Sequence, residues 1–245
     1  MGKLKLGLQL GYWGTQPHVG FVQAAQEAEK LGFDAVFTAE AWGSDCFTPL
    51  VWIAAHTSRI RLGTAICQIA ARTPASTAMH ALTLDHLSGG RFIMGVGPGG
   101  LASDLELFKI GEASLRPAMV LESIDIILRI WAQDPPYDIQ GEFWNVQIKK
   151  AIMPELGVGF MPKPLQKPHP PIHISIASPD SASARLAGSK GWGVISGPVA
   201  PRYAVANHWQ AYSEARREAG KRARSEDWRV SRLVIVAPTD AEAEE

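Results

Sequence analysis

The sequence predicts a parallel α/β fold and, among such folds, a (β/α)8 barrel. Short apolar segments alternate with longer amphipathic segments along most of the chain, which is typical of strands and helices that build a parallel sheet. The expected strands are short, apolar and mostly regularly spaced, which favours a closed barrel over an open doubly wound sheet. With 245 residues, 46% of them hydrophobic, the chain is long enough to bury a sizeable core.

The first half of the chain contains four predicted strand–helix pairs. Each strand is a short apolar run, and the helices are segments in which apolar residues recur at helical spacing. Gly32 and Gly89 follow the first and third helices, as glycine often does after a helix C-terminus. The expected strands are 5–10, 34–38, 60–66 and 91–96, and the expected helices are 21–31, 48–57, 74–87 and 116–131.

Residues 134–171 interrupt this alternation, because they are rich in proline and contain hairpin-like pieces such as 141–145. We expect an insertion here, after which the alternation resumes. The later expected strands are 172–176, 192–196 and 228–237, the expected helices are 181–188 and 201–220, and 239–245 resemble the N-cap and acidic first turn of a further helix.

Seven strands are one too few for a closed barrel. Because the chain stops inside the helix after the seventh strand, we expect residues 1–245 to form a single barrel domain that is C-terminally incomplete and ends before the eighth strand. A missing strand would leave two open sheet edges, which favours self-association.

The charge balance excludes an electrostatic basis for binding nucleic acid or an anionic membrane, since Lys+Arg and Asp+Glu number 24 each. The basic run 216–224 is interspersed with glutamates and is interpreted as a solvated helix end. No apolar run reaches 18 residues and the N-terminus lacks the pattern of a signal peptide, so a cytoplasmic enzyme is expected.

The metal-binding residue types are poorly placed in the sequence. Cys46 and Cys67 lie far apart in apolar surroundings and indicate neither a disulfide framework nor a metal site. His169 and His173 are separated by two prolines, which prevents them from sharing a helix face as a zinc motif requires. We therefore expect no metal.

Residues 95–100 match G-x-G-x-x-G between a strand and a polar, helix-like segment. A nicotinamide-binding motif belongs in the first βα turn and needs an acidic partner after the next strand, but this motif follows the fourth strand and Pro98 removes an N–H donor. In a barrel, these glycines would let a flat ring approach the backbone at the strand end. A simple tight turn with a bulge is the alternative.

Two sets of segments carry a family resemblance. Residues 1–96 resemble the luciferase-like oxidoreductases, most closely those that use the deazaflavin coenzyme, through segments 7–13, 38–45, 61–65, 71–75 and 84–92. From Gly97 onward the chain resembles the FMN-dependent branch that includes limonene-type monooxygenases, through segments 97–104, 141–144, 163–171 and 227–230. The resemblance implies a TIM (β/α)8 barrel of the luciferase-like type.

The resemblance also implies where a cofactor would bind. The family's flavin lies at the carboxyl ends of the strands, and a turn after the third strand, often with a non-proline cis peptide, touches its ring; here that turn falls near 63–65. Arg116 would bind the phosphate, for which a guanidinium is well suited, although a solvated helix-start arginine is the alternative. The implied cofactor contacts are Gln9, Thr64, Ala65, Val96, Gly97, Arg116, Ser178 and Ser181.

The implied catalytic residues are Glu40 and Trp42. Luciferases carry a Glu-His-His run after the second strand, whereas this chain has Glu40-Ala41-Trp42 and lacks the histidine. Trp42 would stack near the ring or enclose the substrate. Glu40 would act as a general acid/base or a hydrogen-bonding partner, with a structural carboxylate as the alternative.

The resemblance implies an FMN-dependent monooxygenase that uses reduced flavin from a partner reductase, together with O2, on a small apolar substrate. A deazaflavin-dependent oxidoreductase that transfers a hydride without oxygen is the first alternative. A truncated barrel fragment without catalysis is the second. The family likeness also implies a homodimer formed through early helices such as the apolar face 47–55.

Overall fold

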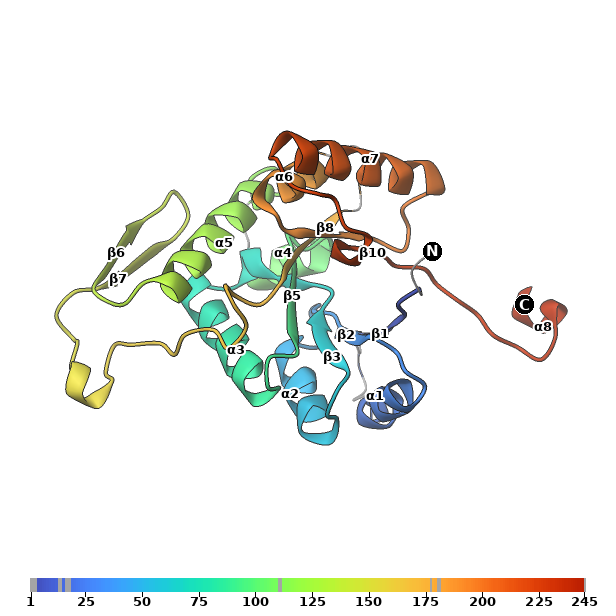
Figure 1. Ribbon diagram of the computed structural model, residues 1–245, viewed down its shortest axis with the longest axis horizontal. Coiled ribbons are helices and arrows are strands. Elements are labelled where there is room, and N and C mark those ends of the chain that lie inside the picture. The colour runs from blue at the N-terminus through green and yellow to red at the C-terminus, as the bar shows by residue number, and fades with distance from the viewer. Residues whose placement is uncertain are drawn as a thin grey trace. The chain divides into compact units, whose positions relative to one another are not determined.

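The computed structural model describes residues 4–12, 15, 19–109, 112–176, 178–179 and 182–244. Within it the chain divides into two compact units, Met1–His173 and Ile174–Glu245, coloured blue to yellow and orange to red in Figure 1. Each unit is built from parallel strands and helices, as the alternating sequence pattern predicts. A single domain stays a prediction.

A parallel sheet forms the centre of the first unit. Its strands β1 (Gly7–Gly11), β2 (Ala35–Thr38), β3 (Arg61–Thr64) and β5 (Phe92–Gly97) lie in that order. Val36 lies opposite both Leu8 and Leu62, and Leu62 lies opposite Phe92, so apolar residues form a row across the sheet. A short strand β4 (Cys67–Gln68) pairs in parallel with the end of β5.

Five helices connect or follow these strands. They are α1 (Phe21–Lys30), α2 (Phe47–His56), α3 (Pro74–Leu87), α4 (Ala102–Phe108) and α5 (Arg116–Ala132). The bounds of α3 match the prediction because the sequence marks both ends: Thr73 caps the N-terminus by accepting from the Ser76 N–H, and Gly89 adopts positive φ after the C-terminus. Helix α4 is the helix-like segment expected after the glycines.

The proline-rich segment contains an antiparallel hairpin of β6 (Tyr137–Gln140) and β7 (Asn145–Ile148). In the expected hairpin piece 141–145, residues 141–144 form the turn and Asn145 begins β7. The Glu122 carboxylate on α5 fastens that turn, because it accepts from the backbone N–H groups of Glu142, Phe143 and Trp144 at 2.8–3.0 Å.

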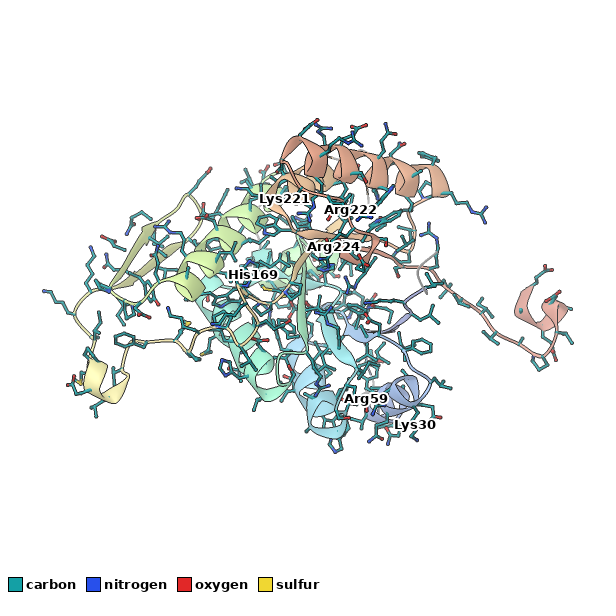
Figure 2. The ribbon with its side chains drawn as sticks, viewed as in Figure 1. Lys30, Arg59, His169, Lys221, Arg222 and Arg224 are labelled. Carbon is teal, nitrogen blue, oxygen red and sulfur yellow. The ribbon has the colours of Figure 1, made fainter. Side chains whose placement is uncertain are left out.

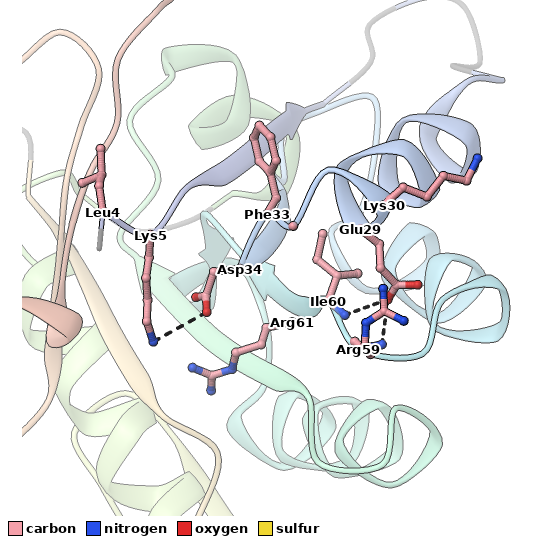
Figure 3. Close-up of a pocket in the computed structure, with 10 residues that line it drawn as sticks. Leu4, Lys5, Glu29, Lys30, Phe33, Asp34, Arg59, Ile60 and Arg61 are labelled. Carbon is pink, nitrogen blue, oxygen red and sulfur yellow. Dashed lines mark hydrogen bonds and ion pairs between the residues drawn. The ribbon is translucent and has the colours of Figure 1, made fainter. Parts of the chain in front are cut away.

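At the amino ends of the strands, an open pocket of about 580 Å³ lies among the end of α1 and the residues before β1, β2 and β3 (Figure 3). Glu29 on its wall accepts from the backbone N–H groups of Arg59 at 2.6 Å and Ile60 at 2.8 Å. Burial opposes the ionised form, but these backbone hydrogen bonds outweigh it and lower the pKa of Glu29. The carboxylate therefore fixes the turn that starts β3.

Glu29 is expected to contribute stability only above acidic pH. Because its folded pKa lies below the ordinary value of 4.5, its contribution is present above that value and is lost as the pH falls through the folded pKa. Glu29→Gln should thus lower the free energy of unfolding at about pH 7, and the difference from the parent should shrink towards about pH 3. Urea unfolding of the parent and the variant at both pH values measures this difference in the free energy of unfolding. A difference that does not change with pH would contradict a stabilising role of the ionised Glu29 carboxylate.

The second unit contains most of β8 (Ile172–Ile176), which begins two residues before the boundary, and β9 (Gly193–Ser196) and β10 (Trp228–Val230), which are parallel. Helices α6 (Ala182–Lys190) and α7 (Arg202–Glu218) pack against each other. In the basic run 216–224, which begins in the last turn of α7 and is labelled in part in Figure 2, four of the five cations are exposed as expected. The fifth, Arg216, is buried and pairs with Asp227 at 3.7 Å.

The seventh expected strand is shorter than predicted. Residues 228–237 alternate like a strand, but β10 ends at Val230, which lies opposite Ser196, the last residue of β9. The Ser231 N–H still donates to the Ser196 carbonyl at 3.0 Å, but the strand pairing does not continue past Val230 in the described residues. The prediction of a strand to 237 is therefore wrong, and the apolar side chains Leu233–Val236 are 64–88% exposed. The expected last helix is α8 (Asp240–Glu244), where Thr239 and Glu242 form a reciprocal cap.

None of the helices in the part of the chain that the structure describes is long and apolar enough to cross a membrane.

Candidate functional site

Glu40 is the centre of a polar network at the carboxyl ends of the strands in the first unit. It follows β2 by two residues, and its carboxylate accepts from Arg72 Nε at 2.9 and 3.1 Å and from Arg72 Nη2. The backbone N–H of Gln68, in β4, donates to Glu40 Oε2 at 2.9 Å. This fork-to-carboxylate pairing holds both side chains in one geometry.

The Glu40–Arg72 ion pair is mostly buried, with side chains 9% and 21% exposed. Burial alone would lower the pKa of Arg72, but hydrogen bonding and the charge of Glu40 outweigh it and raise that pKa. The guanidinium is therefore a permanent charge beside the carboxylate.

Gln68 connects Glu40 to the glycine turn. Its Nε2 donates to the Glu40 carbonyl at 3.0 Å and to Asp104 Oδ2, on α4, at 2.6 Å. Gly99 adopts φ +73°, and a Cβ added there would lie 2.4 Å from Gln68 Oε1. On the other side Arg116 Nη1, at the start of α5, donates to the Gly99 carbonyl at 3.0 Å. Gln68 and Arg116 therefore fix the turn from two elements.

Three buried polar atoms of this network lack a protein partner among the described residues: Gln68 Oε1, Asp104 Oδ1 and Arg116 Nε. Buried polar groups in native proteins are normally paired, so such a cluster is typical of a place where a ligand or water binds. The two oxygens could accept from N–H groups of a ligand, and the Arg116 Nε could donate to a carbonyl or phosphate oxygen. The residues present at the glycine turn thus fit a flavin-type cofactor.

Gly99→Ala is expected to destabilise the protein by about 1–3 kcal/mol, since alanine disfavours positive φ and its Cβ would displace Gln68. Gly100→Ala is the matched control, because a Cβ there meets nothing within 4 Å. Urea unfolding of both variants measures the difference. Equal stability of the two variants would contradict the packing of Gln68 against Gly99.

The turn after β3 contains the expected cis peptide, between Ala65 and Ile66. Gln9 Nε2 donates to the Ala65 carbonyl at 3.2 Å, and Glu40 N donates to the Ile66 carbonyl at 3.1 Å. Gln9, Ala65 and Glu40 therefore meet at this turn. Their contacts with a cofactor stay predictions.

Thr64, Val96 and Gly97 are buried in the sheet. The Thr64 hydroxyl donates to the Gly95 carbonyl at 2.7 Å and accepts from the Gly95 N–H at 2.9 Å, which ties β3 to β5. Val96 and Gly97 lie opposite Cys67 and Gln68 of β4. These positions pack against protein on the described side, and their predicted contact with a ring is untested.

Trp42 and Arg116 differ in exposure. Trp42 is 43% exposed and packs edge-on against Tyr12, with ring centroids 5.4 Å apart, so this aromatic pair lies at the surface. In the sequence, Trp42 follows Glu40 by two residues. Arg116 is only 7% exposed, and the alternative of a solvated helix-start arginine is wrong. Its role in phosphate binding stays a prediction.

The two serines implied for the cofactor belong to the second unit. Ser181 lies outside the described residues. The Ser178 carbonyl accepts from His208 Nε2 at 2.7 Å, so His208 Nδ1 is the acceptor for the Ser196 hydroxyl at 3.0 Å. Ser196 Oγ in turn accepts from Trp228 Nε1 at 3.0 Å. The loop that carries Ser178 is thus held by a fully buried histidine that no sequence pattern marks.

His208→Ala is expected to destabilise the protein by about 2–4 kcal/mol, because the loss of the imidazole leaves Ser196 and the Ser178 carbonyl without their buried partner. His56→Ala, on an exposed helix end, is the control and should change stability by less than about 0.5 kcal/mol. Thermal unfolding compares them; a neutral His208 variant would show that the network is dispensable.

The structure also brings together two cysteines that the sequence separates. The Sγ atoms of Cys46 and Cys67 and a carboxylate oxygen of Glu40 all lie within 4.8 Å of one another. Burial, the Cys67 thiol and the charge of Glu40 raise the pKa of Cys46. The sequence indicates this meeting only through the position of each cysteine after an expected strand: Cys67 directly follows 60–66, and Cys46 lies eight residues after 34–38.

A parallel α/β arrangement with a polar network at the carboxyl ends of its strands is typical of α/β enzymes, barrels among them. The sequence profile of the luciferase-like monooxygenase family matches residues 11–245, and the chain belongs to this family. Its members include oxidoreductases and monooxygenases.

Two relatives and one solved structure illustrate the family. A putative coenzyme F420-dependent oxidoreductase of Mycobacterium tuberculosis is 39% identical over 98% of this chain and 68% of its own length. Limonene 1,2-monooxygenase of Rhodococcus erythropolis is 28% identical over 91% of this chain and 56% of its own. The crystal structure of monooxygenase RslO1 from Streptomyces bottropensis superposes with a TM-score of 0.85 at 27% identity, covering 98% of this chain and 74% of that one.

These comparisons confirm the expected α/β barrel class of the luciferase-like type and the resemblance to both branches. The likeness to an F420-dependent relative extends over 98% of the chain and is not confined to the first 96 residues. Because the chain spans 68% and 56% of the two relatives, the activity, substrates and partners of the whole protein are proposals.

Proposed function

We propose that the chain carries the cofactor site of an oxidoreductase that uses the deazaflavin coenzyme F420. The observation that carries a cofactor site is the cluster of unpartnered polar atoms on Gln68, Asp104 and Arg116 around the glycine turn. The choice of F420 is supported by the F420-dependent relative and by Ala41-Trp42 at the place of the luciferase histidine. When bound, the coenzyme would supply hydride transfer.

The chain's own residues would position the coenzyme and handle a proton. Arg116 would bind the phosphate through its guanidinium. Gln9 and Ala65 would contact the ring at the turn after β3. Glu40 would accept a proton from the substrate at its carboxylate, with Arg72 as the counter-charge that holds it in place.

The aromatic pair Tyr12–Trp42 would form a wall for the substrate, since both rings are partly exposed and lie close in sequence to Gln9, in β1, and to Glu40. A largely aromatic wall favours a small apolar substrate. Val96 and Gly97 would complete the floor beneath the ring.

An FMN-dependent monooxygenase is the second candidate. It is supported by the 28% identity to limonene 1,2-monooxygenase and by the superposition on monooxygenase RslO1. In that case a reductase would supply reduced FMN, O2 would be the second substrate, and the protein would work as a homodimer. Arg116 and Glu40 would keep the roles given above.

Fluorescence titration of the purified protein with F420 and with FMN tests the proposal. Saturable quenching by F420, with FMN much weaker, is the expected result. Tighter binding of FMN would favour the second candidate. A protein that binds neither would contradict both and favour a fragment without catalysis.

A further inference from the structure

Two thiols and a carboxylate converge next to the Glu40–Arg72 pair. One ligand atom each from Glu40, Cys46 and Cys67 lies within 4.8 Å of the other two. Both thiols are fully buried, and they are the only cysteines of the chain. Two soft sulfur donors and one oxygen donor are a set that zinc and similar cations prefer.

Each of the three donors is held by a different ordered segment. Glu40 follows β2 and is fixed by Arg72 and Gln68. Cys46 precedes α2, and its carbonyl accepts from the Thr38 hydroxyl at 2.7 Å. Cys67 lies in β4, opposite Val96. The donors are therefore brought together by the fold itself rather than by a chance meeting of exposed side chains.

We propose that Glu40, Cys46 and Cys67 form a binding site for a thiophilic divalent cation, with zinc as the biological candidate. With Zn–S bonds of about 2.3 Å and Zn–O bonds of about 2.1 Å, donor atoms at a tetrahedral zinc lie about 3.4–3.8 Å apart. Donors within 4.8 Å of one another need to close by about 1 Å to reach that geometry. Water would take the fourth position.

The charges balance when the cation binds. Two thiolates and the Glu40 carboxylate carry three negative charges, and the cation with the Arg72 guanidinium carries three positive charges. Binding releases one proton from each thiol to solvent and forms two metal–sulfur bonds, without any change of oxidation state. Arg72 thus acts as the resident counter-charge that a buried site of this composition requires.

Occupation of the site would engage a carboxylate oxygen of Glu40 as a metal ligand. Since Glu40 is the proton acceptor in the proposed function, the cation would act as an inhibitor of turnover; this consequence rests on the proposed function, whereas the site does not. Zinc inhibition that disappears in a Cys67→Ala variant is the expected kinetic result.

Titration of the reduced, metal-free protein with Cd2+ tests the site directly, because cadmium–thiolate bonds absorb in the ultraviolet. We expect a band that saturates at about one equivalent and is lost in Cys46→Ala and in Cys67→Ala. Glu40→Gln should keep the band but bind at least about tenfold more weakly. Glu29→Gln, a carboxylate at the other end of the strands, should bind like the parent.

The parent protein provides a readout that does not depend on the variants folding. Zinc should slow the reaction of both cysteines with a thiol reagent under native conditions and should raise the melting temperature. The proposal would be overturned by the absence of a cadmium band in the parent or by a band that persists in the double cysteine variant. It would also be overturned if the thiols reacted with the thiol reagent equally fast in the presence and absence of zinc. The cadmium titration contains no coenzyme, so its failure and a failure to bind F420 or FMN are separate results.

Discussion

Replacing Arg72 with alanine is expected to lower the free energy of unfolding by about 3–5 kcal/mol, since it leaves the Glu40 carboxylate buried without its counter-charge. The loss includes the guanidinium hydrogen bonds to both carboxylate oxygens. Glu40→Ala should lower the free energy of unfolding by a similar amount, because it leaves the Arg72 guanidinium and the Gln68 N–H without their acceptor. Urea unfolding of the single variants and of the double variant gives the coupling free energy between the two side chains.

The ion pair Lys30–Glu27 is the matched control for this cycle. Its side chains are 72% and 61% exposed, and Glu27→Ala should change stability by less than about 0.5 kcal/mol. The double variant of Glu40 and Arg72 should lose less than the sum of the single losses. Additive losses at Glu40 and Arg72 would contradict the pairing on which the site is built.

Arg116→Ala is expected to weaken cofactor binding by about 10- to 100-fold, because a charge-assisted hydrogen bond to phosphate contributes about 1.5–3 kcal/mol. The variant also removes the donor to the Gly99 carbonyl, so the glycine turn should loosen. Fluorescence titration with F420 and with FMN measures the change in dissociation constant.

Arg129→Ala controls for the charge on the same helix. Arg129 lies in the last turn of α5, and its side chain is 44% exposed. Its loss should leave the cofactor affinity unchanged and lower stability slightly at most. Equal affinity of the Arg116 and Arg129 variants would show that Arg116 does not bind the phosphate.

Much of the fold could be predicted because local patterns determine it. Helix α3 carries Thr73 and Pro74 at its start and Gly89-Gly90 after its end, so both bounds follow from capping chemistry. The strand 228–237 shows the limit of such patterns. Its apolar alternation is real, but a strand also needs a neighbour, and β9 ends opposite Val230.

The placement of Glu40 and the glycine turn at the carboxyl ends of the strands could be predicted, but the contacts between them could not. The rule that barrel enzymes place their chemistry at the carboxyl ends of strands singled out the glycine turn, and the family resemblance singled out Glu40. The pairs Glu40–Arg72 and Gln68–Asp104 join residues that lie 32 and 36 positions apart. Such meetings depend on strand register and loop paths, which no local pattern encodes. The convergence of Cys46 and Cys67 was missed for the same reason.

The central claim is that the cofactor binds at the carboxyl ends of the strands and not in the pocket at their amino ends. Hydrogen–deuterium exchange with and without the tighter-binding coenzyme tests this claim most directly, since binding at either end would protect different segments. If the carboxyl ends hold the cofactor, binding should slow amide exchange in 38–42, 64–68 and 97–104 and leave 29–34 and 58–61, beside the open pocket, unchanged. Protection confined to the pocket segments 29–34 and 58–61 would contradict the site proposed around Glu40 and Arg116.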